Sequence, residues 1–168
     1  MRNLAVAAIL IFVAVLFRFA PHPMNFTPVL AMALLSGRWF KSSWGLAVPL
    51  LAMVLSDAVL GFSEISAFVY LSMSAAFVIG WVFNRGSYGS LTLQAFLSSV
   101  LFFVISNAGV WWTSGMYSLS FQGLINSYVA AIPFFHNTLL STVMFALGLQ
   151  FLKTKIAFRV SREVTKAA

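Results

Sequence analysis

Six long apolar segments make up most of this chain, and they constrain its fold more than any other feature. They cover residues 3–20, 23–37, 44–61, 66–84, 91–112 and 133–152. A helix needs about 20 mainly apolar residues to cross the hydrocarbon core of a bilayer, and the second segment is short by that measure. The sequence predicts an all-α integral membrane protein with six transmembrane helices in a single domain over residues 1–168. The first segment is expected to stay as a helix, because Arg18 and Pro21 lie where a signal peptidase requires small residues.

The basic residues are distributed unequally among the connections. The first, third and fifth connections contain only Arg18, at one edge. Because Lys and Arg collect in cytoplasmic loops, we predict that both termini are cytoplasmic, in a multi-pass protein of the cell inner membrane. The other nine of the ten Lys and Arg residues fall at the amino terminus, in the second and fourth connections and in a basic tail over residues 153–168: Arg2, Arg38, Lys41, Arg85, Lys153, Lys155, Arg159, Arg162 and Lys166.

Composition excludes a soluble domain and several kinds of chemistry. Hydrophobic residues make up 61% of the chain and charged residues 8%, whereas soluble domains carry about a quarter charged residues. The net charge of +7 favours membrane lipids with anionic headgroups as partners, and no motif indicates nucleic-acid binding. Cysteine is absent, which removes disulfides, thiolate metal sites and cysteine nucleophiles. Because the sequence also lacks a nucleophile elbow, an HExxH motif and an ATPase motif, we expect no enzyme activity, metal or cofactor, and an external energy source.

Polar residues gather near the predicted outer ends of five segments. Ionisable side chains at membrane depth are costly and usually face a bundle interior or a wet cavity, so these residues predict an outward-facing ligand pocket. They are Arg18, Asp57, Tyr70, Asn107, and His136 with Asn137.

Simpler interpretations of the same residues remain open. Arg18 could extend to the membrane interface, or form a structural pair with Asp57. Trp111 is a candidate for the pocket but also fits an ordinary aromatic belt. His136 and Asn137 follow Pro133, where a helix is expected to start, so they could serve as caps.

Two connections contribute further candidates. The first contains Pro21, Pro23 and Pro28, which prevent regular helix and should hold His22, Asn25 and Thr27 in a stiff wall or lid over the pocket. The fifth, over residues 113–132, is too long for a plain turn; residues 119–131 look helical and offer Asn126, Ser127 and Tyr128 to a ligand.

Small residues recur at helical spacing in two segments. Ser72, Ala76 and Gly80 form a stripe in the fourth segment, and Ala33 with Gly37 does so in the second. Such stripes allow helices to approach closely. We expect an internal contact, with partner docking as the alternative.

The whole arrangement resembles the S components of energy-coupling-factor (ECF) vitamin transporters, which have six short helices, a site near the outer face and no energy domain. The residues that carry the resemblance are the Arg18 to Pro28 segment, the Ala-rich second segment that ends at Gly37, and Ser56-Asp57 with Gly61. Solitary cobalamin-uptake proteins are a second comparison. The resemblance implies a binder that captures a vitamin or metal-related nutrient outside and delivers it by reorienting in the membrane. It also implies a coupling module of two ATPases and a transmembrane scaffold as partner.

Two departures separate this chain from those families. The alanines of the first segment never take the Ala-xxx-Ala spacing through which S components often dock on the scaffold, and there is no cysteine to approach cobalt. In a cobalamin binder, His22 or His136 would have to replace that cysteine.

Three function classes follow from the sequence. A small-molecule-binding subunit for uptake of a vitamin or similar micronutrient, energised by a separate ATPase module or acting alone, explains the outer pocket best. A structural or assembly subunit of a membrane complex is the main alternative. A small intramembrane enzyme is the third, and it would need a nucleophile and a base in recognisable roles.

Overall fold

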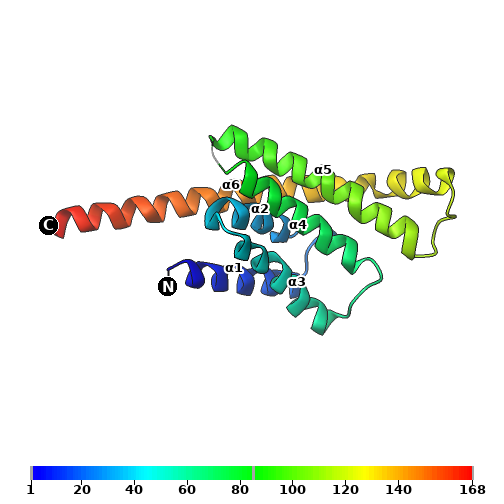
Figure 1. Cartoon of the computed structure of the whole chain (residues 1–168), viewed down its shortest axis with the longest axis horizontal. Coiled ribbons are helices and arrows are strands. Elements are labelled where there is room, and N and C mark those ends of the chain that lie inside the picture. Colours follow the sequence, from blue (N-terminus) through cyan, green and yellow to red (C-terminus); the bar gives the residue numbers. More distant parts are fainter. Residues whose placement is uncertain (1, 85, 168) are drawn as a thin grey trace.

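The computed structural model describes residues 2–84 and 86–167, and within them the chain folds into six α-helices and one short 3-10 helix (Figure 1). This confirms the all-α class and the expected number of helices. Arg85 lies outside the described residues, as do the side chains of Arg2, Arg162 and Lys166. The elements are α1 (Arg2–Phe19), α2 (Val29–Phe40), η1 (Ser43–Leu46), α3 (Ala47–Leu60), α4 (Ser66–Val82), α5 (Tyr88–Thr113) and α6 (Phe121–Ala167).

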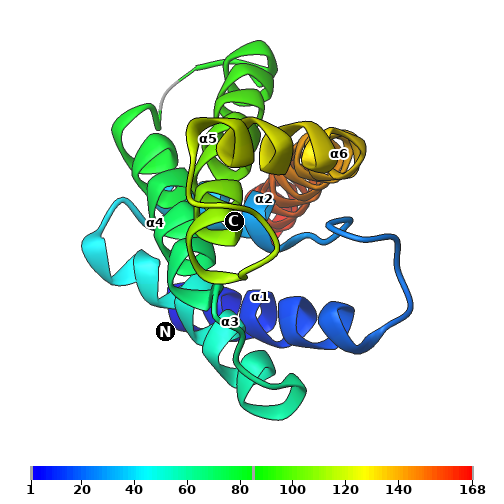
Figure 2. The ribbon, with the colours of Figure 1, turned by 90° about the vertical axis from the view of Figure 1, so that its right-hand side faces the viewer.

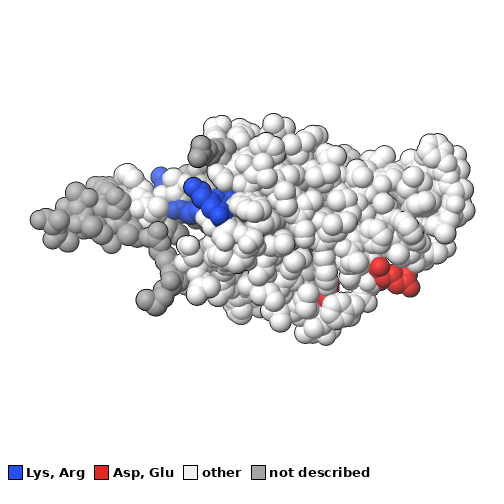
Figure 3. Space-filling model, in the orientation of Figure 1, with Lys and Arg blue, Asp and Glu red and all other residues white. Residues whose placement is uncertain are grey.

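The helices run up and down along the long axis of the molecule. Both termini lie at one end, which we call the terminal end, and the carboxyl-terminal part of α6 extends beyond the bundle there (Figure 1). The connections α3–α4 and α5–α6 lie toward the opposite end, which we call the distal end, and the α1–α2 connection lies on the side of the bundle that faces this end. On the face drawn in Figure 3, Lys and Arg side chains gather toward the terminal end and acidic ones toward the distal end.

Helix α2 lies at the centre of the bundle, with α1 and α3 on one side and α4, α5 and α6 around the other (Figure 2). Ten of its 12 residues are buried. Small and aliphatic side chains all around the helix allow it to contact each of the other five helices. At 12 residues it is roughly 18 Å long, so it fills only part of the length of the bundle.

The tightest helix contact joins α2 to α4 through two glycines. A Cβ atom on Gly37 would lie 2.1 Å from the carbonyl oxygen of Phe77, and one on Gly80 would lie 1.9 Å from that of Leu34. Both distances are far below van der Waals contact, so each glycine makes room for the backbone of the other helix. The predicted small-residue stripes are therefore confirmed as an internal contact.

Four predicted helices match the structure within a few residues, but the predicted segment 23–37 is wrong at both ends. α2 begins only at Val29, because the prolines and Asn25, which has a φ of 62°, hold the preceding residues out of helical geometry. It continues past Gly37 to Phe40, since that glycine serves a helix contact and does not end the helix. Lys41, with a φ of 51°, ends it instead.

The prediction for the last helix, residues 133–152, is also wrong at both ends. α6 contains Pro133 in its interior and continues through the basic tail to Ala167. A proline removes one helical hydrogen bond, but in a helix packed among apolar neighbours the rest of the helix persists around it. The long fifth connection shrinks to residues 114–120, because the expected helix over 119–131 is the first part of α6.

Within the part of the chain that the structure describes, three segments are long and apolar enough to cross a membrane by themselves: Ser43–Leu60, Tyr88–Thr113 and Phe121–Arg159. The remaining apolar helices are shorter, at 10–17 residues. The membrane character of the chain is thus supported at the level of helix length and composition.

Candidate ligand-binding site

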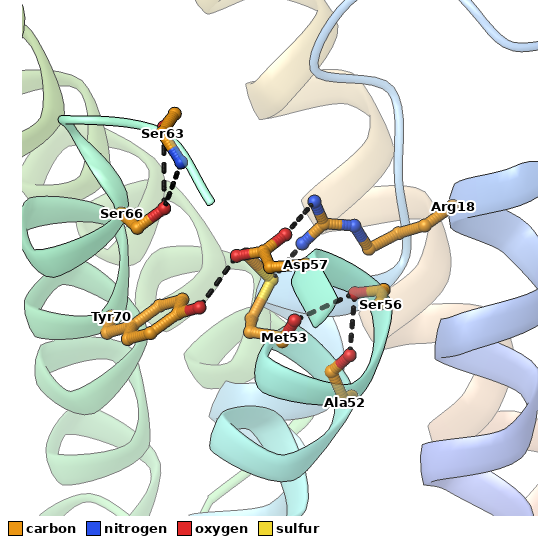
Figure 4. Close-up of polar contacts among 8 residues, drawn as sticks. All are labelled: Arg18, Ala52, Met53, Ser56, Asp57, Ser63, Ser66 and Tyr70. Atoms are coloured by element: carbon orange, nitrogen blue, oxygen red, sulfur yellow. Dashed lines mark hydrogen bonds and ion pairs between the residues drawn. The ribbon is translucent and has the colours of Figure 1, made fainter. Parts of the chain in front are cut away.

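Arg18, Asp57 and Tyr70 meet at the distal end of the bundle (Figure 4). The Arg18 Nη2 atom lies 2.6 Å from Asp57 Oδ1, and the Tyr70 hydroxyl donates to Asp57 Oδ2 at 2.7 Å. Arg18 comes from α1, Asp57 from α3 and Tyr70 from α4, so one carboxylate joins three helices. Arg18 Nη1 also lies 2.6 Å from the sulfur of Met53.

The position of Asp57 explains why it needs these partners. It lies in the last turn of α3, where its carbonyl accepts a hydrogen bond from the Gly61 N–H at 2.8 Å. A negative charge is unfavourable at the carboxyl end of a helix, and the residue is only 4% exposed. The Arg18 guanidinium therefore compensates both the helix dipole and the loss of solvent.

The ion pair lines a cavity of about 420 Å³, which we call the polar cavity. It lies beyond the amino-terminal end of α2, where Val29 and Leu30 form part of its wall. The first turn of α2 has no side-chain cap, and the first N–H groups of a helix have no partner within it. The polar lining residues are Arg18, His22, Asn25, Thr27, Asp57, Ser63, Ser66, Thr138, Ser141 and Thr142.

One wall of the polar cavity is the α1–α2 connection, residues 20–28, which we call the strap. The Asn137 Nδ2 atom donates to the Met24 carbonyl at 3.0 Å, and the Ser141 hydroxyl to the Asn25 carbonyl at 3.4 Å. His22 stacks on Phe17, with ring centroids 5.9 Å apart. The strap is thus held between α1 and α6 and closes the side of the cavity above the short helix α2.

A second cavity of about 380 Å³ lies between the distal halves of α5 and α6, and we call it the apolar cavity. Aromatic side chains form much of it: Phe103 lies 5.1 Å from Phe135 between ring centroids. Met24 of the strap and Met116 of the α5–α6 connection also line it. The other apolar lining residues are Ile65, Val69, Phe102, Val110, Ala130, Ala131 and Phe134.

A family model described as a family of unknown function (DUF6580) matches residues 1–161. The chain belongs to this family. The match includes every residue that lines either cavity. No curated protein matches the chain, and no solved structure does.

The structure of this DUF6580 chain brings five of the ten predicted site residues together. Arg18, His22, Asn25 and Asp57 line the polar cavity, and Asn25 also lines the apolar cavity. Tyr70 reaches the site through its hydrogen bond to Asp57. The predicted structural pair between Arg18 and Asp57 is present as well. The same two residues therefore join α1 to α3 and line the polar cavity.

The other predicted residues have different surroundings. Asn107 lines the apolar cavity, where its Nδ2 atom donates to the Phe103 carbonyl at 2.8 Å. Trp111 donates to the Ser118 carbonyl and so holds the α5–α6 connection, and Asn137 holds the strap. Asn126 and His136 are exposed and line neither cavity. The interpretation of His136 and Asn137 as helix caps is wrong, because α6 does not start at Pro133.

Sequence reasoning missed the three hydroxyl side chains of α6 that line the polar cavity. Thr138, Ser141 and Thr142 are all buried, and each hydroxyl donates to a main-chain carbonyl. Their spacing of three and four residues places them on one face of a helix, and this pattern could have identified them. Among the described residues, no three acidic or His side chains lie close enough together to hold a metal ion.

Proposed function

We propose that this DUF6580 member is a substrate-binding membrane subunit for the uptake of a vitamin or a similar micronutrient. The observation that carries the proposal is the Arg18–Asp57–Tyr70 network in the wall of the polar cavity. A convergent polar cluster in a concave site of about 300–1,000 Å³ is typical of small-molecule binding. At about 420 Å³ and about 380 Å³, both cavities are within that range.

The distribution of charge supports an outward-facing site. Both cavities are lined by the distal connections, whereas Lys41, Lys153 and Lys155 belong to the opposite, terminal end. By the positive-inside rule the terminal end is cytoplasmic. We therefore place six spans in the cell inner membrane with both termini in the cytoplasm. In that arrangement the short helix α2 is shielded from lipid by its neighbours. The strap then covers the part of the span that α2 is too short to cross.

The resemblance to ECF S components extends the proposal to the transport step. In this view the chain captures its ligand outside and releases it inside by reorienting, and it does not transform the ligand. The energy comes from a separate module of ATPases and scaffold, or the chain acts alone. The usual Ala-xxx-Ala spacing is absent from α1, so we do not propose docking through that pattern.

The test is native mass spectrometry of the protein purified in lipid nanodiscs. We expect the parent protein to carry a small molecule, and Asp57→Asn to lower its occupancy about tenfold, because it loses a polar contact of about 1–2 kcal/mol. Asn126→Ala is the matched control, since Asn126 bonds only Gln122 on its own helix and should keep full occupancy.

A parent protein that carries no small molecule, but that co-purifies with a stoichiometric protein partner, would instead identify an assembly subunit. Folding of each variant is checked by its thermal unfolding temperature. If Asp57→Asn unfolds well below the parent protein and its folded fraction still holds the molecule, Asp57 acts in folding alone.

A further inference from the structure

The polar cavity and the apolar cavity adjoin each other. They share five lining residues, which come from the strap, the start of α4, α5 and α6: Asn25, Ile65, Val69, Phe102 and Thr138. A side chain that lines both cavities stands between them, so single side chains separate the two spaces. One molecule can therefore occupy both if it passes beside these residues.

The polar cavity offers both acceptors and donors of hydrogen bonds. The hydroxyls of Thr138 and Thr142 donate their single hydrogens to main-chain carbonyls, so their oxygens retain only the capacity to accept, as does the carboxylate of Asp57. Arg18 and the uncapped first turn of α2 supply donors. The formal charges of Arg18 and Asp57 cancel, so an uncharged group that both donates and accepts fits best.

The apolar cavity offers almost the opposite chemistry. Three of its polar side chains are bonded within their own helices: Ser106 donates to the Phe102 carbonyl, Asn107 to that of Phe103, and Ser127 to that of Leu124. Aromatic rings and small apolar residues form most of the remaining surface. Such a cavity binds through the removal of apolar surface from water.

We propose that the molecule bound by this chain is an uncharged amphipathic compound, with a hydrogen-bonding head in the polar cavity and a ring or short chain in the apolar cavity. This inference rests on the proposed function and narrows its substrate class. It excludes a wholly polar nutrient, which would leave the apolar cavity unused, and a singly charged one, which would unbalance the ion pair.

The test measures how tightly ω-phenylalkyl ureas with linkers of increasing length bind to the protein in nanodiscs. Methylurea represents the head group alone. We expect the best phenylalkyl urea to bind at least tenfold more tightly than methylurea to the parent protein. Ala131→Trp fills the apolar cavity from a residue that is 8% exposed. It should abolish this gain while leaving methylurea binding unchanged.

Two further variants make the result decisive. Val129→Trp adds the same side chain to the same helix at a position that is 59% exposed, and it should keep the gain. Ser106→Phe fills the apolar cavity from α5, and it should abolish the gain even if Ala131→Trp fails to fold.

Three results would overturn the inference. A gain that persists in both filling variants would mean that the phenyl ring enters lipid and not the cavity. If the phenylalkyl ureas bind no more tightly than methylurea, the ligand of this protein is wholly polar. A parent protein that holds a co-purified molecule but binds none of the ureas would refute the proposed head group, and in the last two cases the proposed uptake function would stand.

Discussion

At the scale of single residues, Asp57 depends on groups far from it in sequence. Arg18 is 39 positions away and Tyr70 13 positions away, yet both contact the same carboxylate. The side chains of Arg18 and Asp57 are 20% and 6% exposed, so the pair is screened from water only in part. A largely buried pair of this kind holds α1 against α3 and at the same time presents charge to the polar cavity.

We expect Arg18→Met to lower the free energy of unfolding by about 3–5 kcal/mol, because it leaves a buried carboxylate without its cation. Asp57→Leu should lower the free energy of unfolding by less, because the charge that it leaves unpaired belongs to Arg18, the more exposed partner. The double variant should recover part of the loss, with a coupling energy of about 1–3 kcal/mol. Unfolding by detergent titration, followed by circular dichroism, measures all three. Strictly additive losses would show that the two side chains do not stabilise each other.

At the scale of elements, the crossing of α2 and α4 is fixed by backbone contact. We expect Gly37→Ala and Gly80→Ala each to lower the free energy of unfolding by about 1–3 kcal/mol, because the added methyl group meets a carbonyl oxygen and the helices must separate. Gly148→Ala is the matched control, since nothing lies within 4 Å of a Cβ atom there. Its free energy of unfolding should remain within about 1 kcal/mol of that of the parent protein. Equal thermal unfolding temperatures for all three variants would contradict the close crossing.

The strap is an element without regular structure, and its position depends on α6. We expect Asn137→Ala to raise amide hydrogen exchange over residues 20–28 about fivefold, because it removes a hydrogen bond of about 1 kcal/mol to the Met24 carbonyl. Asn126→Ala, on the same helix but bonded only to Gln122, should leave exchange in the strap unchanged. Exchange mass spectrometry resolves the relevant peptides, and no difference between the two variants would show that the strap is held by its prolines alone.

At the scale of the whole molecule, helices of very different length form one bundle. α6 has 47 residues and is roughly 70 Å long, more than twice the thickness of a hydrocarbon core of about 30 Å. α2, with 12 residues, is shorter than that core. The strap and both cavities occupy the length that α2 leaves unfilled at the distal end, so the site exists because the central helix is short.

The cysteine-free sequence makes the proposed orientation directly testable. We expect a membrane-impermeant maleimide to label Met116→Cys in intact cells, because Met116 lies in the α5–α6 connection and is 71% exposed. Lys41→Cys, in the exposed connection after α2, should be labelled only after the cells are opened. The reverse pattern would place the termini outside and the cavities toward the cytoplasm.

From the sequence alone one can predict the all-α class, the number and order of the helices and the unequal distribution of charge. These properties are local: each apolar run, each proline and each Lys or Arg acts through its own segment. Arg18 and Asp57 could be identified for the same reason, because polar side chains are rare in such runs, and His22 and Asn25 because prolines mark the first connection. The helix ends at Gly37 and Pro133 could not be placed, since a glycine can end a helix or admit a neighbour, and a proline can start a helix or lie within one.

Which of these polar residues meet depends on how the helices pack. The tertiary structure separated Asn126 and His136 from the cavities, and it added Thr138, Ser141 and Thr142 to the polar cavity. It also placed α2 at the centre, where Gly37 and Gly80 allow the backbone of α4 to approach. The physical reason is that burial and side-chain partners depend on packing between helices distant in sequence, which no single segment contains.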